Sequence, residues 1–166
     1  MEIRLHWQPP LPLVRVRVRV PRYECDYLDE VPDQPGIYVF GRIRGSIVEP
    51  LYIGLAKNLS RRVRQHLRSN ASLMAHLYAA TAGRRVLLVG ELVSGHGKST
   101  HRVLRSIERA MIRYAMGQGC DILNKHGARR PAYQLRHEGN RKATAWMPRR
   151  IDAEQLKAHR GRRLKY

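Results

Sequence analysis

The stretch GIYVFGRIRGSIVEPLYIGLAKNLSRRVRQH, residues 36–66, decides the fold of this chain. It holds two apolar runs rich in aromatic and β-branched residues, at positions 37–40 and 51–53, and such runs predict strands. Residues 41–50 between them carry glycine, serine and proline, so we predict a hairpin. In each run a tyrosine stands beside a glycine, and glycine lets another backbone or a ligand come close.

A helix is predicted directly after the second run. Asn58 or Ser60 can cap it by accepting from the free N–H groups of its first turn. Its apolar residues recur every four positions and form a core stripe: Leu59, Val63 and Leu67. Arg62 and His66 are also four apart, on a neighbouring face. Two tyrosines, an arginine and a histidine thus converge beside the hairpin. Such a set can handle a phosphodiester, because arginine neutralises phosphate and a phenol or imidazole passes a proton.

The charge of the chain favours a polyanionic partner. The 166 residues include 32 Lys and Arg against 13 Asp and Glu, a formal net charge of +19. This field favours nucleic acid, although an over-basic surface or a membrane-surface binder also fits the charge. No apolar run approaches the ~20 residues that span a bilayer. The two cysteines have neither metal-ligand nor disulfide spacing, so we expect a reduced, cytoplasmic protein, associated with the nucleoid if it is bacterial.

Residues 13–20 alternate between apolar residues and arginines. Period two predicts a strand, with the valines packed on a core. The arginines on the other face are Arg15, Arg17 and Arg19. Two interpretations of this face remain open: a solvated surface that keeps the strand from pairing wrongly, or a row that contacts phosphates. Residues 1–12, which prolines interrupt, are expected to be irregular.

A Gly-Lys-Ser segment lies between a predicted strand at residues 86–93 and a predicted helix from residue 100. This order is similar to a phosphate-binding loop. The pattern needs a glycine five residues before Gly97, where this chain has Leu92, so the nucleotide-binding motif is absent. A hydroxyl residue of the loop is more simply a helix cap. Lys98 beside the helix N-terminus remains a candidate contact for a backbone phosphate.

The predicted helix at residues 100–116 carries one unusual carboxylate. A basic stripe runs along one face: Arg102, Arg105, Arg109 and Arg113. Glu108 does not belong to it, because Leu104 and Ile112 flank it at four residues on either side. A carboxylate within an apolar arc is costly unless something pairs with it. A divalent metal or a buried salt bridge would do so, and the residues alone leave these two equal.

The ordered set of motifs resembles the GIY-YIG nuclease family. Two short signatures, a helix that follows them, and a glutamate and an asparagine further along stand in the family's order over roughly residues 30–126. The matching positions are Gly36-Ile37-Tyr38, Tyr52-Ile53-Gly54, Asn58, Leu59, Arg62, His66, Glu108 and Asn124. Leu55 departs from the pattern, because many members carry lysine directly after the second signature, and Lys57 is two residues on.

The resemblance implies an α+β fold with a central, mostly antiparallel three-stranded sheet flanked by helices. The implied organisation is an N-terminal extension with the Arg/Val strand at residues 1–29, a nuclease core at 30–126 and a basic C-terminal extension at 127–166. It also implies metal-dependent hydrolysis of DNA phosphodiester bonds by a single-metal mechanism.

The resemblance assigns a role to each matching side chain. Glu108 would hold one Mg²⁺ or Mn²⁺, and Arg62 would bind the non-bridging phosphate oxygens. Tyr38 or Tyr52 would accept the proton of the attacking water, and the resemblance allows either. His66 would hydrogen-bond one of them or relay its proton. The supporting residues are Gly36, Gly54 and Asn124.

Charge alone selects further candidate contacts to nucleic acid. Several alternative functions also remain open. The candidates are Arg15, Arg17, Arg19, Lys57, Arg61, Lys98, Arg105 and Arg109. A catalytically silent nucleic-acid-binding module, an RNA-directed nuclease and a basic structural protein of a ribonucleoprotein also fit the charge. One site of this kind cuts one strand, so double-strand cleavage would imply a dimer or two sequential cuts.

Overall fold

Three long antiparallel strands form the centre of the molecule. The computed structural model describes residues 4–93, 100–125, 134–136 and 150–152. In it β5 (Gly36–Arg44) pairs with β6 (Ile47–Ala56) on one side and with β7 (Arg84–Leu92) on the other. The predicted hairpin is confirmed. Its tight turn contains Gly45, whose φ of 58° is a left-handed conformation that glycine adopts without strain.

The first strands of the chain extend this sheet beyond β7. β1 (Leu5–Trp7) and β2 (Leu11–Pro12) both pair antiparallel with β7 and complete a five-stranded sheet. The prediction that residues 1–12 are irregular was therefore wrong for these two strands. Proline is tolerated here because an edge strand hydrogen-bonds along one side only.

The prediction of a continuous Arg/Val strand with its valines on a core was also wrong. Only β3 (Val14–Val16) is a strand, and it pairs with β4 (Arg22–Glu24) in a separate two-stranded sheet. The side chains of Val14, Val18 and Val20 are 52%, 54% and 66% exposed. Alternation buries one face only where another layer covers it, and here the core is filled by Leu11 and Leu13 just upstream.

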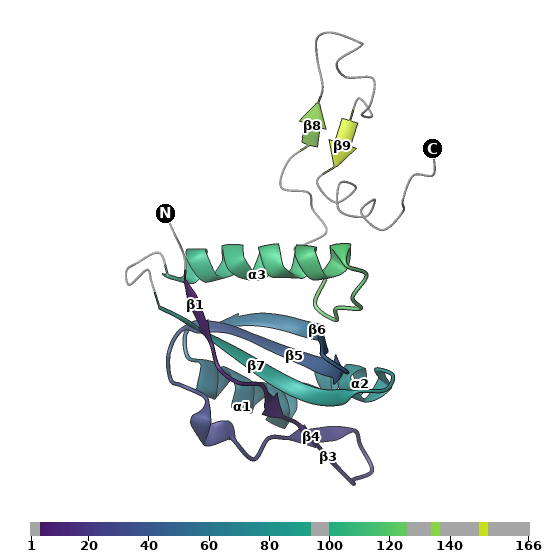
Figure 1. Ribbon diagram of the computed structural model, residues 1–166. Helices are drawn as coiled ribbons and strands as arrows, with labels where there is room; N and C mark the ends of the chain where they lie inside the picture. The colour runs from purple at the N-terminus through teal and green to yellow at the C-terminus, as the bar shows by residue number, and fades with distance from the viewer. Residues whose placement is uncertain (1–3, 94–99, 126–133, 137–149, 153–166) are drawn as a thin grey trace.

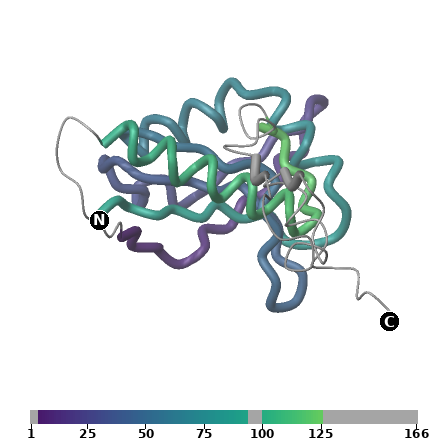
Figure 2. Tube along the Cα trace, turned by 90° about the horizontal axis from the view of Figure 1, so that it is seen from above, coloured from purple at the N-terminus to yellow at the C-terminus, as the bar shows by residue number. Residues whose placement is uncertain are grey.

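Helices cover both faces of the main sheet (Figures 1 and 2). α1 (Leu59–Ser69) and α2 (Ala71–Ala79) lie against one face, and α3 (Thr100–Gly117) lies across the other. Strand alternation divides the core accordingly. Tyr38 and Phe40 pack with the residues of α1 and α2, whereas Ile37 and Val39 pack with those of α3. The expected class, an antiparallel sheet flanked by helices, agrees with this architecture.

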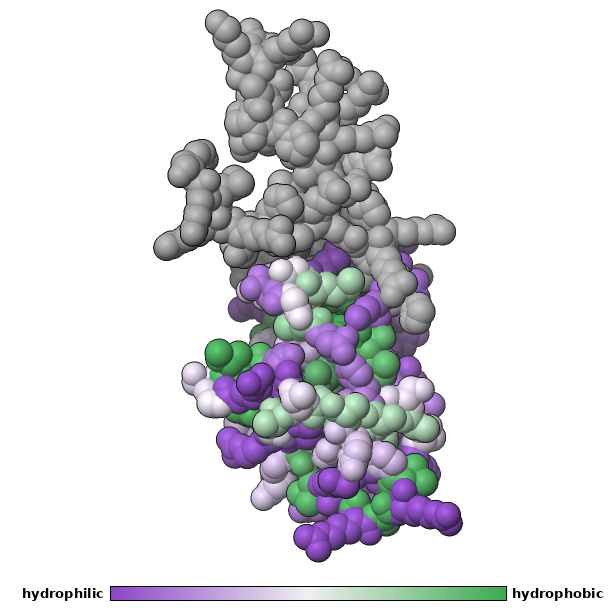
Figure 3. All heavy atoms as spheres, turned by 90° about the vertical axis from the view of Figure 1, so that its right-hand side faces the viewer, coloured by the Kyte–Doolittle hydropathy of each residue, from purple (hydrophilic) through white to green (hydrophobic). Residues whose placement is uncertain are grey.

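The remaining described elements are short. η1 (Leu28–Glu30) is a single 3₁₀ turn before β5, and β8 (Gln134–Arg136) pairs antiparallel with β9 (Arg150–Asp152). Lys98 and most of the predicted C-terminal extension lie outside the described residues. Within the described part of the chain, no helix has the length and apolar character needed to cross a membrane. On the face seen in Figure 3, hydrophilic and hydrophobic residues interleave.

Candidate active site

The strand register brings the two signature tyrosines to one face of the hairpin. Tyr38 on β5 lies opposite Gly54 on β6, and Phe40 lies opposite Tyr52. Residues directly opposite each other in an antiparallel pair project to the same side. The rings of Tyr38 and Tyr52 are accordingly stacked, with centroids 6.2 Å apart and planes 18° apart. Tyr38 is 1% exposed, whereas Tyr52 is partly exposed and forms the accessible end of the pair.

Two glycines make this arrangement possible. A Cβ at Gly54 would overlap the hydroxyl group of Tyr38, and a Cβ at Gly36 would overlap the backbone carbonyl of Gly90 on β7. Gly54 therefore admits a side chain across the hairpin, and Gly36 admits the neighbouring strand. Both predicted supporting glycines have a steric reason in the structure.

His66 on α1 contacts the buried tyrosine. Its Nε2 lies 2.7 Å from the Tyr38 hydroxyl, and its ring centroid lies 5.4 Å from that of Tyr38 and 5.2 Å from that of Tyr52. Burial, and then the positive charge of Arg62, lower the pKa of His66 to about 4. The imidazole is therefore neutral near pH 7.

The two phenols influence each other's protonation. Burial raises the pKa of both Tyr38 and Tyr52 above that of a free tyrosine. The hydrogen bond between them raises the pKa of Tyr38 and lowers that of Tyr52. Arg62 lowers the pKa of both phenols, because its positive charge favours a phenolate.

The start of α1 positions Arg62. Asn58, at the N-cap, accepts with its side chain a 2.8 Å hydrogen bond from the Arg61 backbone, so of the two predicted caps, Asn58 and Ser60, it is Asn58 that caps the helix. The guanidinium of Arg62 is exposed and donates from Nη1 to Gln65 Oε1 at 2.8 Å. An exposed guanidinium one turn before His66 is available to an anion that approaches Tyr52.

Glu108 reaches the same site from the opposite layer. Burial raises the pKa of its carboxyl, while a hydrogen bond from the backbone of Leu55 and the charges of Arg105, Arg109 and Arg62 lower it. The charge of Glu108 in turn raises the pKa of Tyr52. The helix α3 and the tyrosine face thus meet at β6, the outermost strand on this side of the sheet. In the described part of the chain, no group of three or more His, Cys, Asp or Glu side chains could hold a metal together.

Asn124 holds the backbone of the second signature. Its Oδ1 accepts from the N–H of Ile53 at 3.3 Å, and its Nδ2 donates to the carbonyl of the same residue. The N–H of Leu123 also donates to the carbonyl of Leu51 at 2.9 Å. A turn residue would hydrogen-bond backbone groups near it in sequence, whereas Asn124 bonds the distant backbone of Ile53, which lies between Tyr52 and Gly54.

One residue of the site escaped the sequence analysis. Asn70 Nδ2 lies 2.8 Å from His66 Nδ1, the ring nitrogen that does not face Tyr38. Its position between two helical segments is typical of a cap, and it does cap α2 through a hydrogen bond from the Leu73 N–H. The available signal was the spacing of four residues after His66, which places an amide next to the imidazole on one helix face.

Comparison with known proteins gives one partial similarity. The chain is 30% identical over 106 residues to UvrABC system protein C from Symbiobacterium thermophilum. The matched stretch is 64% of this chain and 13% of the length of that protein. No family model matches the chain, and no solved structure matches it.

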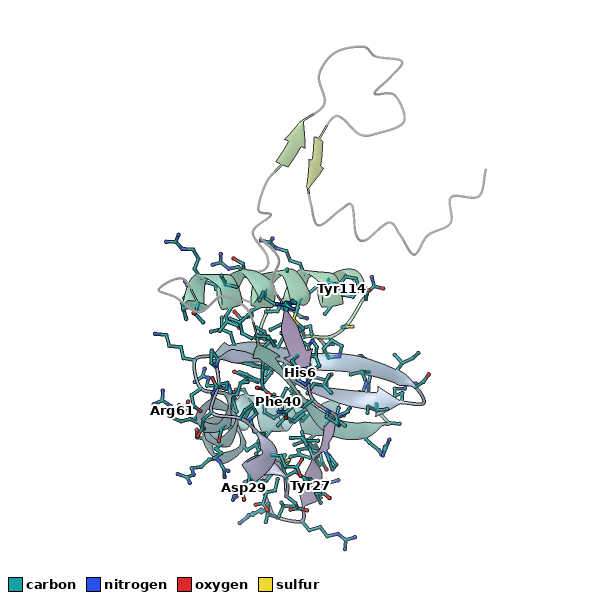
Figure 4. The ribbon with its side chains drawn as sticks, turned by 60° about the vertical axis from the view of Figure 1, so that its left-hand side comes forward. His6, Tyr27, Asp29, Phe40, Arg61 and Tyr114 are labelled. Atoms are coloured by element: carbon teal, nitrogen blue, oxygen red, sulfur yellow. The ribbon has the colours of Figure 1, made fainter. Side chains whose placement is uncertain are left out.

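The predicted nucleic-acid contacts are distributed unevenly around this site. Arg61 on α1 and Arg105 and Arg109 on α3 are exposed, as is Lys57 between β6 and α1. Figure 4 shows Arg61 directed away from the body, in contrast to Phe40 inside it. The other three described candidates lie on β3 and the bend that follows: Arg15, Arg17 and Arg19. The guanidinium of Arg15 lies over the ring of Tyr78, 4.3 Å from its centroid, and donates to its hydroxyl at 3.0 Å.

Proposed function

We propose that this protein is a metal-dependent nuclease that hydrolyses phosphodiester bonds of DNA. The observation that carries the proposal is the convergence of five side chains from β5, β6, α1 and α3 at one end of the hairpin: Tyr38, Tyr52, Arg62, His66 and Glu108. The partial similarity to UvrABC system protein C supports the coarser statement, that the chain contains a nuclease domain. The net charge of +19 supports a nucleic-acid substrate.

In this proposal Arg62 binds the phosphate. The Arg62 side chain is exposed, and the guanidinium N–H donors beyond those that contact Gln65 and Tyr38 suit the non-bridging oxygens of a phosphodiester. The same positive charge lowers the pKa of the tyrosine beside it. Binding and proton transfer are therefore coupled through one residue.

Tyr52 is the better candidate for the base. Its ring is partly exposed, so a water molecule can contact its oxygen, whereas the Tyr38 side chain is 1% exposed and lies behind it. In the hydrolytic step a water oxygen bonds to phosphorus, its proton passes to the Tyr52 oxygen, and the bond from phosphorus to the 3′ oxygen breaks. Burial raises the pKa of Tyr52 above that of a free tyrosine, and the hydrogen bond with Tyr38 and the charge of Arg62 oppose this rise and favour the phenolate that the role requires.

The donor set fits one divalent cation held largely by water. Glu108 is a half-buried carboxylate whose burial disfavours its charge, so a cation there would offset that cost. Mg²⁺ keeps several waters and needs few protein ligands, in agreement with a site that offers one carboxylate. When bound, Mg²⁺ or Mn²⁺ supplies a Lewis acid that polarises the phosphate and stabilises negative charge on the leaving 3′ oxygen.

The proposal is tested by cleavage of supercoiled plasmid with Mg²⁺ or Mn²⁺. We expect nicking by the native protein, none with EDTA, and none by Glu108→Gln or Tyr52→Phe. Glu24→Gln is the matched control, because Glu24 is an exposed carboxylate that pairs with Arg22 on a separate sheet. Metal-dependent cleavage that survives Glu108→Gln would refute the role of this carboxylate. Tight, salt-sensitive binding of DNA or RNA without cleavage would favour a silent binding module instead.

A further inference from the structure

Asn70 stands at the junction of α1 and α2, and its side chain has one possible orientation. The Asn70 Oδ1 atom lies 3.0 Å from the backbone nitrogen of Leu73, in the first turn of α2. A backbone N–H can only donate, so the atom that faces it must be the amide oxygen. The two ends of an asparagine amide are otherwise hard to tell apart, and here the cap distinguishes them.

This orientation determines where the proton of the His66 ring lies. The amide nitrogen of Asn70 faces His66 Nδ1 at 2.8 Å, and an amide nitrogen can only donate. His66 Nδ1 must therefore accept, and in a neutral imidazole the single ring proton then lies on Nε2. Nε2–H in turn donates to the Tyr38 oxygen at 2.7 Å.

The direction continues through the tyrosines. Because the Tyr38 oxygen already accepts from His66, its own hydroxyl proton is available to another acceptor, and the neighbouring phenol is that of Tyr52, whose ring stacks on that of Tyr38 with centroids 6.2 Å apart. The result is a series of hydrogen bonds with one polarity, from Asn70 through His66 and Tyr38 to Tyr52. It begins at a helix junction and ends at the accessible phenol.

We propose that Asn70 is a positioning residue that selects the Nε2–H tautomer of His66 and thereby directs the hydrogen bonds of the site toward Tyr52. The consequence for catalysis rests on the proposed function, because it assigns the water proton to Tyr52 and keeps Tyr38 as a donor. The tautomer itself does not depend on any activity. It is a property of the folded protein alone.

The identity of the residue supports this role. Ser, Thr and Asp cap helices about as well as Asn. At this junction only Asn also supplies an N–H for the imidazole. The groups that face the ring from the packed elements are Tyr38 on β5, Tyr52 on β6 and Arg62 on α1. In the part of the chain that the structure describes, Asn70 is the group that contacts His66 Nδ1.

The test is a measurement of the ring nitrogens by long-range ¹H–¹⁵N NMR on the full chain labelled with ¹⁵N-histidine. The spectra are recorded well above the pKa of a free histidine, so that the rings are neutral, and His66 is assigned from the signal lost in His66→Gln. We expect Nε2 protonated in the native protein. Asn70→Asp keeps the cap of α2 but offers His66 only an acceptor, so we expect Nδ1 protonated in that variant.

Asn70→Ser is the matched control, because serine also caps the helix but does not extend to the ring. We expect a mixture of the two tautomers there. Nδ1 protonated in the native protein, or an unchanged tautomer in both variants, would overturn the proposal. In plasmid cleavage we expect Asn70→Asp to lower the rate at least tenfold while the affinity for DNA stays unchanged. A shifted tautomer in a protein that never cleaves would uphold the positioning role and reject only the proposed function.

Discussion

The hydroxyl group of Tyr38 lies over the Cα of Gly54, so close that a Cβ at position 54 would overlap it. The two residues face each other across the hairpin, on β5 and β6. Because residue 54 has no side chain, the Tyr38 hydroxyl has the space to lie beside His66 and Tyr52. The glycine of the second signature therefore determines the position of the tyrosine hydroxyl of the first.

Gly54→Ala is therefore expected to displace Tyr38 and destabilise the fold by about 1–3 kcal/mol, the usual cost of overpacking a core. We also expect loss of plasmid cleavage. The free energy of unfolding follows from urea denaturation. Gly45→Asn is the control, because nothing lies within 4 Å of a Cβ there and asparagine tolerates the left-handed φ of that turn. Equal effects of the two substitutions would contradict the steric account.

The stability of the protein should fall in mild acid because of His66. Its pKa is about 4 in the folded protein, below the 6.5 of a free histidine, so the unfolded chain binds the additional proton first. The stability that the neutral His66 gives to the folded protein is fully present above pH 6.5 and is lost as the pH falls to about 4. A shift of this size corresponds to roughly 3 kcal/mol.

The measurement is urea denaturation across this pH range for the native protein and for His66→Gln, which cannot titrate. We expect the difference in unfolding free energy between the two proteins to change with pH in favour of the variant as acid is added. A constant difference would mean that the imidazole does not change its charge on unfolding.

Asn124 and Asn58 should respond in opposite ways to the same change. Asn124→Asp removes the donor that contacts the Ile53 carbonyl and should cost about 1–3 kcal/mol. Asn58→Asp keeps the acceptor that caps α1, and a negative charge is favourable at a helix N-terminus, so stability should stay equal or rise by a few tenths of a kcal/mol. Thermal unfolding of both variants checks this contrast. Equal changes in stability for the two variants would show that the donor of Asn124 contributes nothing beyond what its acceptor provides.

Two ion pairs allow the same comparison for charge. Arg42 and Glu49 join β5 to β6, with side chains 10% and 24% exposed, whereas Arg22 and Glu24 are about half exposed. Removing one partner of a buried pair leaves an uncompensated charge, so Glu49→Ala should cost about 3 kcal/mol or more. Glu24→Ala should cost less than about 1 kcal/mol. Chemical denaturation measures both, and an equal cost would show that water reaches Arg42 freely.

Local patterns were sufficient for the elements around the site. The hairpin, the Asn58 cap and the apolar stripe of α1 follow from turn residues, capping chemistry and a four-residue repeat, all of which act within a few positions. The flanks of Glu108, Leu104 and Ile112, are buried as their spacing predicts. Each of these predictions needed no knowledge of a distant partner.

Contacts between distant segments were not predictable in this way. Alternation in residues 13–20 predicts a buried face only if another layer covers it, and no local signal reports that layer. The pairing of β1 with β7 places Leu5 opposite Leu92. Gln8, just after β1, also donates a side-chain hydrogen bond to Glu91, which is 83 positions away. Asn70 was not predicted as part of the site, because its contact with His66 depends on the side chain of His66 turning toward it.

The strands at the beginning of the chain impose an order on synthesis. Residues 5–12 complete the sheet only by pairing with β7, which ends at Leu92. As a ribosome extends the chain, these early residues have no partner until most of the described core has been made, while β5 and β6 can form their hairpin as soon as both exist. The sheet is therefore completed last by strands that were synthesised before the hairpin at its centre.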